Sequence, residues 1–136
     1  IGLSLVGSEM CIRDSISGLS VAITPKFSTS KVLLMVSLGS ISLNAQSIGF
    51  RLLRGSTQIG GATSTANQSG FTNVYAAAVY IMSASHNFLD SPSTTSATTY
   101  KLQWKVASGT GYLGQYHTDT TDYNGSSTIT AMEVSA

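Results

Sequence analysis

The segment Thr99–Val106 constrains the fold of this chain more than any other. Its apolar residues occupy every second position, with polar residues between them: Tyr100, Leu102, Trp104 and Val106 against Lys101, Gln103 and Lys105. A period of two is typical of a strand with one face in a hydrophobic core and the other in solvent. Trp104 is the only tryptophan. We therefore expect Trp104 to anchor the core rather than to stack on a sugar, and the lysines to face outward.

Turn residues divide the rest of the chain into further apolar or alternating segments. Those expected to be strands are Ile16–Thr24, Lys31–Leu43, Ile48–Thr57, Phe71–Ser83, His86–Asp90, Tyr112–Tyr116 and Ser126–Val134. About eight strands, with a turn signal roughly every 8–14 residues, predict an all-β chain. The expected architecture is an antiparallel β-sandwich, jelly-roll-like, formed by residues 16–136 as one domain.

Two segments also fit a helix. Lys31–Leu43 is almost continuously apolar, which favours a strand buried on both faces, with a neighbouring subunit as the cover of the second face. A core helix is the alternative there, and Gly39 argues against it. Phe71–Met82 contains three consecutive alanines between β-branched and aromatic residues. Its flanks favour a strand, and the helix stays open.

Residues 1–15 differ in composition from the rest of the chain. They carry the only cysteine, Cys11, and three charged residues. Leu5–Asp14 can be back-translated into a DNA string that resembles the transposon-end adapter of sequencing libraries, and a secretory signal is the alternative. We therefore expect residues 1–15 to be adapter-derived and poorly packed, in a metagenomic fragment that lacks its true N-terminus. No native cysteine would then remain for a disulfide or a thiolate site.

Charge is scarce, and this limits the classes of partner. Only 10% of residues are charged and the formal net charge is +1, which gives no electrostatic footprint for nucleic acid. No apolar run approaches the roughly 20 residues of a membrane span, so we expect no membrane insertion. A surface so poor in charge suggests burial against other chains.

No arrangement typical of an enzyme is present, so we expect neither catalysis nor a cofactor. The acidic residues after position 15 are scattered over separate elements, whereas glycoside hydrolysis needs a facing pair. Asp90 precedes Ser91-Pro92, and we expect it to cap that turn. His86 is expected to be structural. His117, Asp119 and Asp122 share one loop, but two carboxylates are few for a hard cation, and we favour a solvated loop.

Two loops are candidates for recognition of a ligand. Ala62–Gly70 is small, polar and unpatterned, and His117–Ser127 contains the turn signal Asn124-Gly125. Tyrosines near such loops can stack on sugars or contact proteins. The candidate recognition residues are Asn67, Gln68, Tyr112, Tyr116, His117, Asp119, Asp122 and Tyr123.

From Ile16 to Ala136 the sequence resembles a family of small structural proteins of marine bacteriophages. The matching stretches are ISGLSVAITPKFSTSKVLLMVSLGSIS, FRLLRGSTQIG, FLDSPSTTSATTYKLQW and STITAMEV. The resemblance implies the C-terminal head domain of a tail fibre or virion appendage, made in the bacterial host cytoplasm and carried on the virion. Expected partners are other virion proteins and a host surface glycan or protein. A bacterial carbohydrate-binding or adhesion module is the alternative.

The expected strand order is also similar to that of the trimeric jelly rolls of tumour necrosis factor and the complement globular heads. This similarity implies a homotrimer, with Met132 and Val134 of the last strand near the threefold axis. It is an analogy between folds, and by itself it carries no function.

Overall fold

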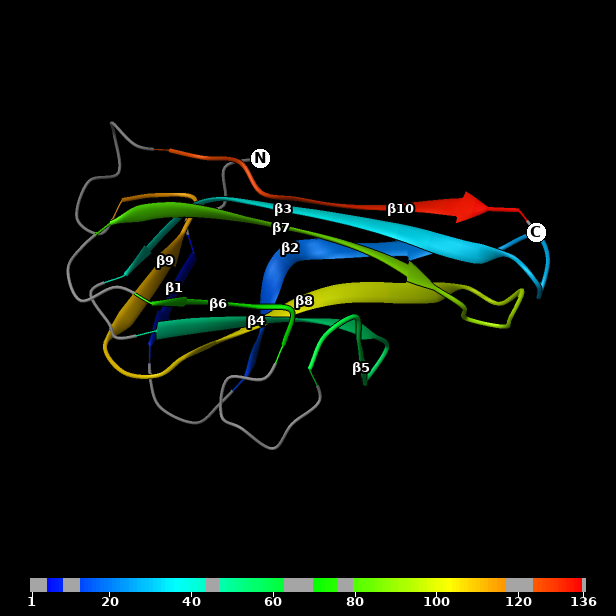
Figure 1. The fold of residues 1–136 in the computed structure, drawn as a ribbon, viewed down its shortest axis with the longest axis horizontal. Coiled ribbons are helices and arrows are strands. Elements are labelled where there is room, and N and C mark those ends of the chain that lie inside the picture. Colours follow the sequence, from blue (N-terminus) through cyan, green and yellow to red (C-terminus); the bar gives the residue numbers. More distant parts are fainter. Residues whose placement is uncertain are drawn as a thin grey trace.

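The chain folds into two antiparallel sheets that face each other (Figure 1). The computed structural model describes residues 5–8, 13–43, 47–62, 70–75, 80–116 and 124–135, and no helix occurs in these ranges. Sheet A contains β1 (Leu5–Ser8), β3 (Lys31–Leu43), β7 (Ile81–Asp90), β9 (Thr110–Leu113) and β10 (Thr128–Val134). Sheet B contains β2 (Asp14–Ile23), β4 (Ser47–Arg54), β5 (Thr57–Ile59), β6 (Thr72–Tyr75) and β8 (Thr98–Val106).

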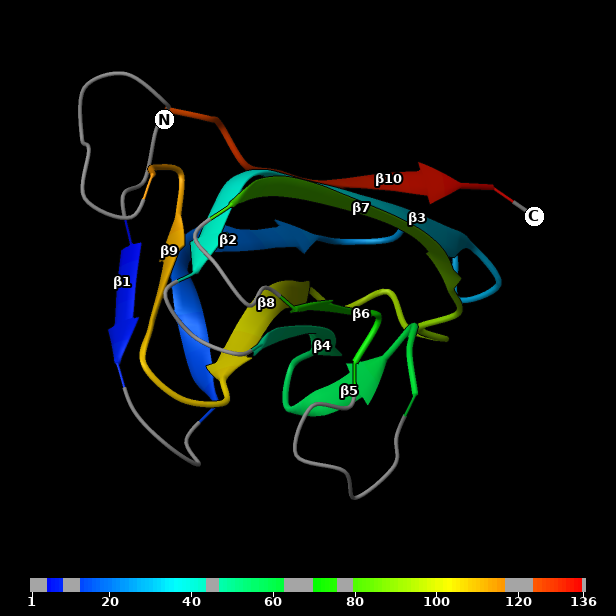
Figure 2. The same cartoon turned by 60° about the vertical axis from the view of Figure 1, so that its left-hand side comes forward.

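Each sheet is built around a long central strand. In sheet A, β3 pairs with β7 along one edge, and with β10 and then β9 along the other. In sheet B, β8 lies between β2 and β4, while β5 and β6 pair with the far edge of β4. The chain crosses repeatedly from one sheet to the other (Figure 2). This connectivity confirms the predicted all-β sandwich, which is jelly-roll-like.

The core lies between the inner faces of the two sheets. Tyr100 and Leu102 of β8 are fully buried and Trp104 is 5% exposed. The Trp104 ring lies 6.3 Å from the ring of Phe50 on β4, centroid to centroid. Val32, Leu34, Val36 and Leu38 of β3 cover them from sheet A. The prediction that Trp104 anchors the core is confirmed.

The outward lysine face that we expected on β8 is wrong for Lys105. Lys101 is half-buried and Lys105 is only 7% exposed. Gly49, directly opposite Lys105 on β4, has no side chain. The long aliphatic stem of Lys105 therefore has room to lie against the sheet, as lysine stems often do.

Within a single chain, Lys31–Leu43 is buried on one face over most of its length, and the expected cover of its second face by a neighbouring subunit stays a prediction. β3 has the predicted bounds, but along Val32–Leu38 its side chains alternate between buried and more exposed. Met35 on the outer face is 36% exposed. Only Ile41–Leu43 is buried at consecutive positions. No described residue of this chain covers the outer face of β3 along Leu33–Ser37.

The alanine-containing segment is extended where the structure describes it. Thr72–Tyr75 forms β6 and Ile81 begins β7, whereas residues 76–79 lie outside the described ranges. β7 continues to Asp90, so the short strand expected at His86–Asp90 is the end of a ten-residue strand. The strand expected at Tyr112–Tyr116 begins earlier, at Thr110, and ends at Leu113.

Part of the N-terminal segment is extended as well. Leu5–Ser8 forms β1, which pairs antiparallel with β9. Asp14 and Ser15 begin β2, and their side chains are exposed. These residues are thus in paired strands, while the expectation that residues 1–15 are poorly packed stays a prediction. Met10 and Cys11 lie outside the described ranges, and the adapter origin stays a prediction.

Candidate functional site

A groove opens at the side of the sandwich where β6 and β7 face each other without pairing. Its volume is about 610 Å³, which falls in the range of small-ligand sites. It is lined by Ser40, Thr72, Asn73, Val74, Tyr75, Ile81, Met82, Ser83 and Ala84. Ser40 has a φ of 51° and lies where the β3–β7 register shifts, between Leu38 and Ile41. This bulge in β3 shapes one end of the groove.

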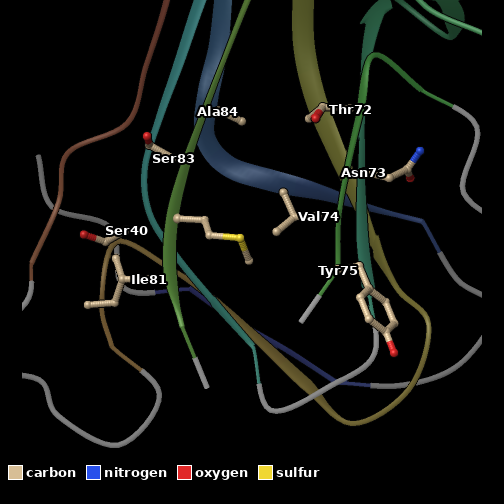
Figure 3. Close-up of a pocket in the computed structure, with 9 residues that line it drawn as sticks. Ser40, Thr72, Asn73, Val74, Tyr75, Ile81, Ser83 and Ala84 are labelled. Atoms are coloured by element: carbon tan, nitrogen blue, oxygen red, sulfur yellow. The ribbon is translucent and has the colours of Figure 1, made fainter. Parts of the chain in front are cut away.

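Strand alternation separates an apolar floor from a polar rim in this groove. Figure 3 shows Val74 pointing into the gap, whereas Asn73 and Tyr75 point away from it. The Tyr75 side chain is 67% exposed. Among the described residues that line the groove, none is charged. The groove suits an uncharged ligand with an apolar surface.

Three aromatic rings stack next to the groove, towards the C-terminal end of β7. The His86 ring lies 4.6 Å from the Phe71 ring, with the two planes 9° apart. The Phe88 ring lies 6.4 Å from the His86 ring, and these two planes are also 9° apart. The His86 Nε2 atom is buried and has no hydrogen-bond partner among the described residues. The stacking agrees with the expected structural role of His86.

A buried polar cluster ties the two sheets together at the end of β7. Arg54 Nη1 on β4 donates to both carboxylate oxygens of Asp90, at 3.0 and 2.9 Å. The Tyr100 hydroxyl on β8 donates to Asp90 Oδ2 at 2.7 Å. Asp90 is 6% exposed. The prediction that Asp90 caps the Ser91-Pro92 turn therefore misplaced its side chain, which points into the sandwich.

The sequence did contain a signal for this cluster. Met82, Ala84, His86 and Phe88 are the inward positions of β7, and Asp90 continues their period of two. An acidic residue at an inward position needs partners. Arg54 and Tyr100, which supply them, are far away in the chain, and only the strand pairing brings them close.

Tyr100 gives the protein a specific sensitivity to alkaline pH. Burial raises the pKa of Tyr100, and its hydrogen bond to the Asp90 carboxylate and the charge of Asp90 raise it further. A pKa raised by folding means a stability contribution that is complete below the unfolded value of about 10 and is lost as the pH rises above it. We expect Tyr100→Phe to be less stable than the wild type at pH 8, and the difference to shrink above pH 10. Urea unfolding of both proteins from pH 8 to 11 measures this, and a constant difference would contradict it.

The candidate recognition residues are only partly described. Tyr112 on β9 and Tyr116 just after it are both half-buried and both make interactions. Asn67, Gln68, His117, Asp119, Asp122 and Tyr123 lie outside the described residues. Sequence reasoning missed Tyr75 and Tyr80, which are 67% and 60% exposed. They flank the alanine segment, whose pattern did not settle which way its side chains face.

The two described carboxylates after position 15 lie apart, and each has its own hydrogen-bond partners. Asp90 binds Arg54 and Tyr100, whereas Glu133 on β10 accepts a hydrogen bond from the Lys26 backbone N–H at 2.7 Å. Within the described ranges, no three His, Cys, Asp or Glu side chains are grouped for a metal ion. The same part of the chain contains no helix with the length and hydropathy to span a membrane.

The outer face of sheet A is the second surface of interest. Three rows cross β10, β3 and β7 on this face: Met132–Leu33–Leu89, Thr130–Met35–Asn87 and Thr128–Ser37–Ser85. None of these nine residues is charged. Met132 and Leu89 are 48% and 46% exposed. A contiguous, uncharged and partly apolar surface of this kind commonly marks an interaction site.

No protein-family model matches this chain, and no curated protein matches it.

Proposed function

We propose that this chain is a non-enzymatic structural domain of a bacteriophage virion, the head of a tail fibre or another appendage. It assembles as a homotrimer, contacts other virion proteins, and presents its loops to a host surface glycan or protein. The bacteriophage context comes from the sequence resemblance. The observation that carries the structural role is the uncharged outer face of sheet A.

The outer face has the composition of an interface core rather than of a solvated surface. Charged residues are depleted at the cores of protein interfaces, where methionine is enriched. Here Met35 and Met132 lie on neighbouring strands, and Leu33 and Leu89 extend the Met132 row. The nearest charge on this face is Lys31, opposite Val134 at the rim. Burial of this face between copies would cover the second side of β3.

Lysine substitutions on the outer face are expected to dissociate the trimer. Met132→Lys and Leu89→Lys each place a charge in the apolar row Met132–Leu33–Leu89, and burying an unpaired charge is costly. We expect the combined variant to be monomeric by light scattering at a concentration where the wild type is trimeric. Ala22→Lys is the matched control, because Ala22 is exposed on sheet B. Equal effects of the control and the outer-face variant would contradict the proposal.

A carbohydrate-binding or adhesion module is the second candidate function, and the β6–β7 groove favours it. The described lining of the groove is uncharged, and Tyr75 beside it, directed away from the gap, exposes a ring of the kind that stacks on sugars. A glycan array with the wild type and Tyr75→Ala tests this function, with loss of binding in the variant as the supporting result. Genes beside the coding sequence separate the two candidates: tail, portal or capsid genes favour the virion.

A further inference from the structure

β10 presents a free edge along its whole length. One edge pairs with β3 through residues 31–37, and no strand among the described residues pairs with the other. Figures 1 and 2 both show β10 at the margin of sheet A. An unpaired edge offers a row of backbone N–H and C=O groups to another strand.

The other edge strands carry features that oppose strand addition. β2 has a register shift between Ser15 and Ser20, with Gly18 at a φ of 80°. β5 and β6 have only three and four residues. β7 also leaves one edge unpaired among the described residues, but its register with β3 shifts between Leu38 and Ile41. β10 has seven residues in regular register, without proline or a basic residue, and its single charged side chain is the inward-pointing Glu133 near its end.

Apolar side chains remain accessible beneath this edge. Ile129 and Ala131 point inward from β10, opposite Val36 and Leu34 of β3. Both are half-buried, as are Val21 and Ile23 of β2, and all four pack against the core. β10 lies beside β2 of the facing sheet, so these side chains form one margin of the core. A further strand on β10 would bury these side chains.

We propose that the free edge of β10 binds an extended segment of another polypeptide as an added antiparallel strand. Its inward residues would be apolar opposite Ile129 and Ala131, and basic opposite Glu133. Its outward residues would be small and uncharged, to continue the rows of Thr128 and Thr130. All described pairings in both sheets are antiparallel, and strand addition to a free edge is a known mode of peptide recognition.

Charge argues for a different polypeptide rather than a second copy of β10. Two β10 strands paired antiparallel over all seven residues would be centred on Ala131. Each Glu133 would then lie opposite Ile129 of the other copy, on the inward side. Such a pair would desolvate two carboxylates against apolar side chains. A basic residue opposite Glu133 adds a counter-charge to a carboxylate that already accepts a hydrogen bond from the Lys26 backbone N–H.

The test uses the full chain and a capped, fluorescein-labelled peptide, Thr-Lys-Thr-Val-Thr-Val-Thr. In antiparallel pairing its lysine lies opposite Glu133 and its valines opposite Ala131 and Ile129. We expect saturable binding by fluorescence anisotropy, and increased hydrogen-exchange protection confined to β10. A peptide with glutamate in place of the lysine should bind about fivefold more weakly, since like charges across strands repel. No saturable binding at millimolar protein, or equal affinity for both peptides, would overturn the proposal.

Two lysine variants of β10 locate the binding edge. Ile129→Lys puts a charge on the inward side and is expected to weaken peptide binding about tenfold. Thr128→Lys points outward and should leave binding within about twofold of the wild type. Circular dichroism checks that both variants fold. Equal weakening by the two variants would overturn the inward register.

Self-pairing is checked separately in a Cys11→Ser, Ala131→Cys protein. A rapid disulfide-linked dimer through Cys at 131 would overturn the proposal in favour of a second copy. The peptide tests are independent of the outer-face variants, so a monomeric protein that still binds the peptide would contradict the trimer alone.

Discussion

Replacing Trp104 with alanine is expected to lower the free energy of unfolding by about 3–5 kcal/mol. Trp104 is the largest side chain of the inner face of β8, and its ring packs against Phe50 from β4. Truncation removes both the buried apolar area and the contacts of the surrounding side chains, which cannot collapse fully into the space. Chemical denaturation followed by circular dichroism, at a fixed chain concentration, measures the change.

Trp104→Phe is the matched control, because it retains an aromatic ring in the same position. We expect a loss of about 1–2 kcal/mol for this variant. An alanine variant that loses less than 1 kcal/mol would contradict the assignment of Trp104 to the core.

Replacing Asp90 with alanine is expected to cost about 2–4 kcal/mol. The substitution leaves the Tyr100 hydroxyl buried without its acceptor and removes the carboxylate that binds Arg54. Arg54 remains about one-third exposed, at 32% of its side chain, so water can solvate its guanidinium and moderate the loss. The cost comes mainly from the buried hydroxyl and the cavity.

A double-mutant cycle isolates the contact between Asp90 and Tyr100. Tyr100→Phe alone should cost about 1–2 kcal/mol, because it removes only the hydroxyl. The two substitutions together should cost less than their sum, since they remove the same hydrogen bond. Additive losses would show that the hydroxyl and the carboxylate do not interact in solution.

Strand positions were predictable because one physical signal determines them. β3 has the bounds expected from its apolar run, and β8 begins one residue before the alternating segment at Thr99. In both strands, side chains alternate between faces, and turn residues mark the ends. The helix alternative for β3 fails because its inward positions have a period of two, from Val32 to Leu38.

Side-chain environments were harder to predict because they depend on pairing between distant segments. Lys105 is buried although it occupies a polar position, and the glycine opposite it on β4 is visible only in the register. Asp90 was assigned to a local turn, yet its partners are 36 residues before it and 10 after it in sequence. A local pattern carries no information on such contacts.

The candidate sites, too, could be predicted from the sequence only in part. The β6–β7 groove forms because two strand edges face each other across the sandwich, which no sequence motif encodes. The outer face of sheet A could be anticipated in part, because the similarity to trimeric jelly rolls implied that Met132 and Val134 lie near a threefold axis. Both are exposed in this chain. Their alignment with Leu33 and Lys31 came from the structure.

The mass of the wild-type protein in solution tests the central proposal most directly. The chain has a mass of 14.2 kDa, so a homotrimer associated through the outer face of sheet A has a mass near three times this value. Light scattering from about 1 to 100 μM chain is expected to give that mass, with dissociation only at the lowest concentrations. A mass of one chain throughout this range would contradict the trimer and leave the outer face of sheet A without its proposed role.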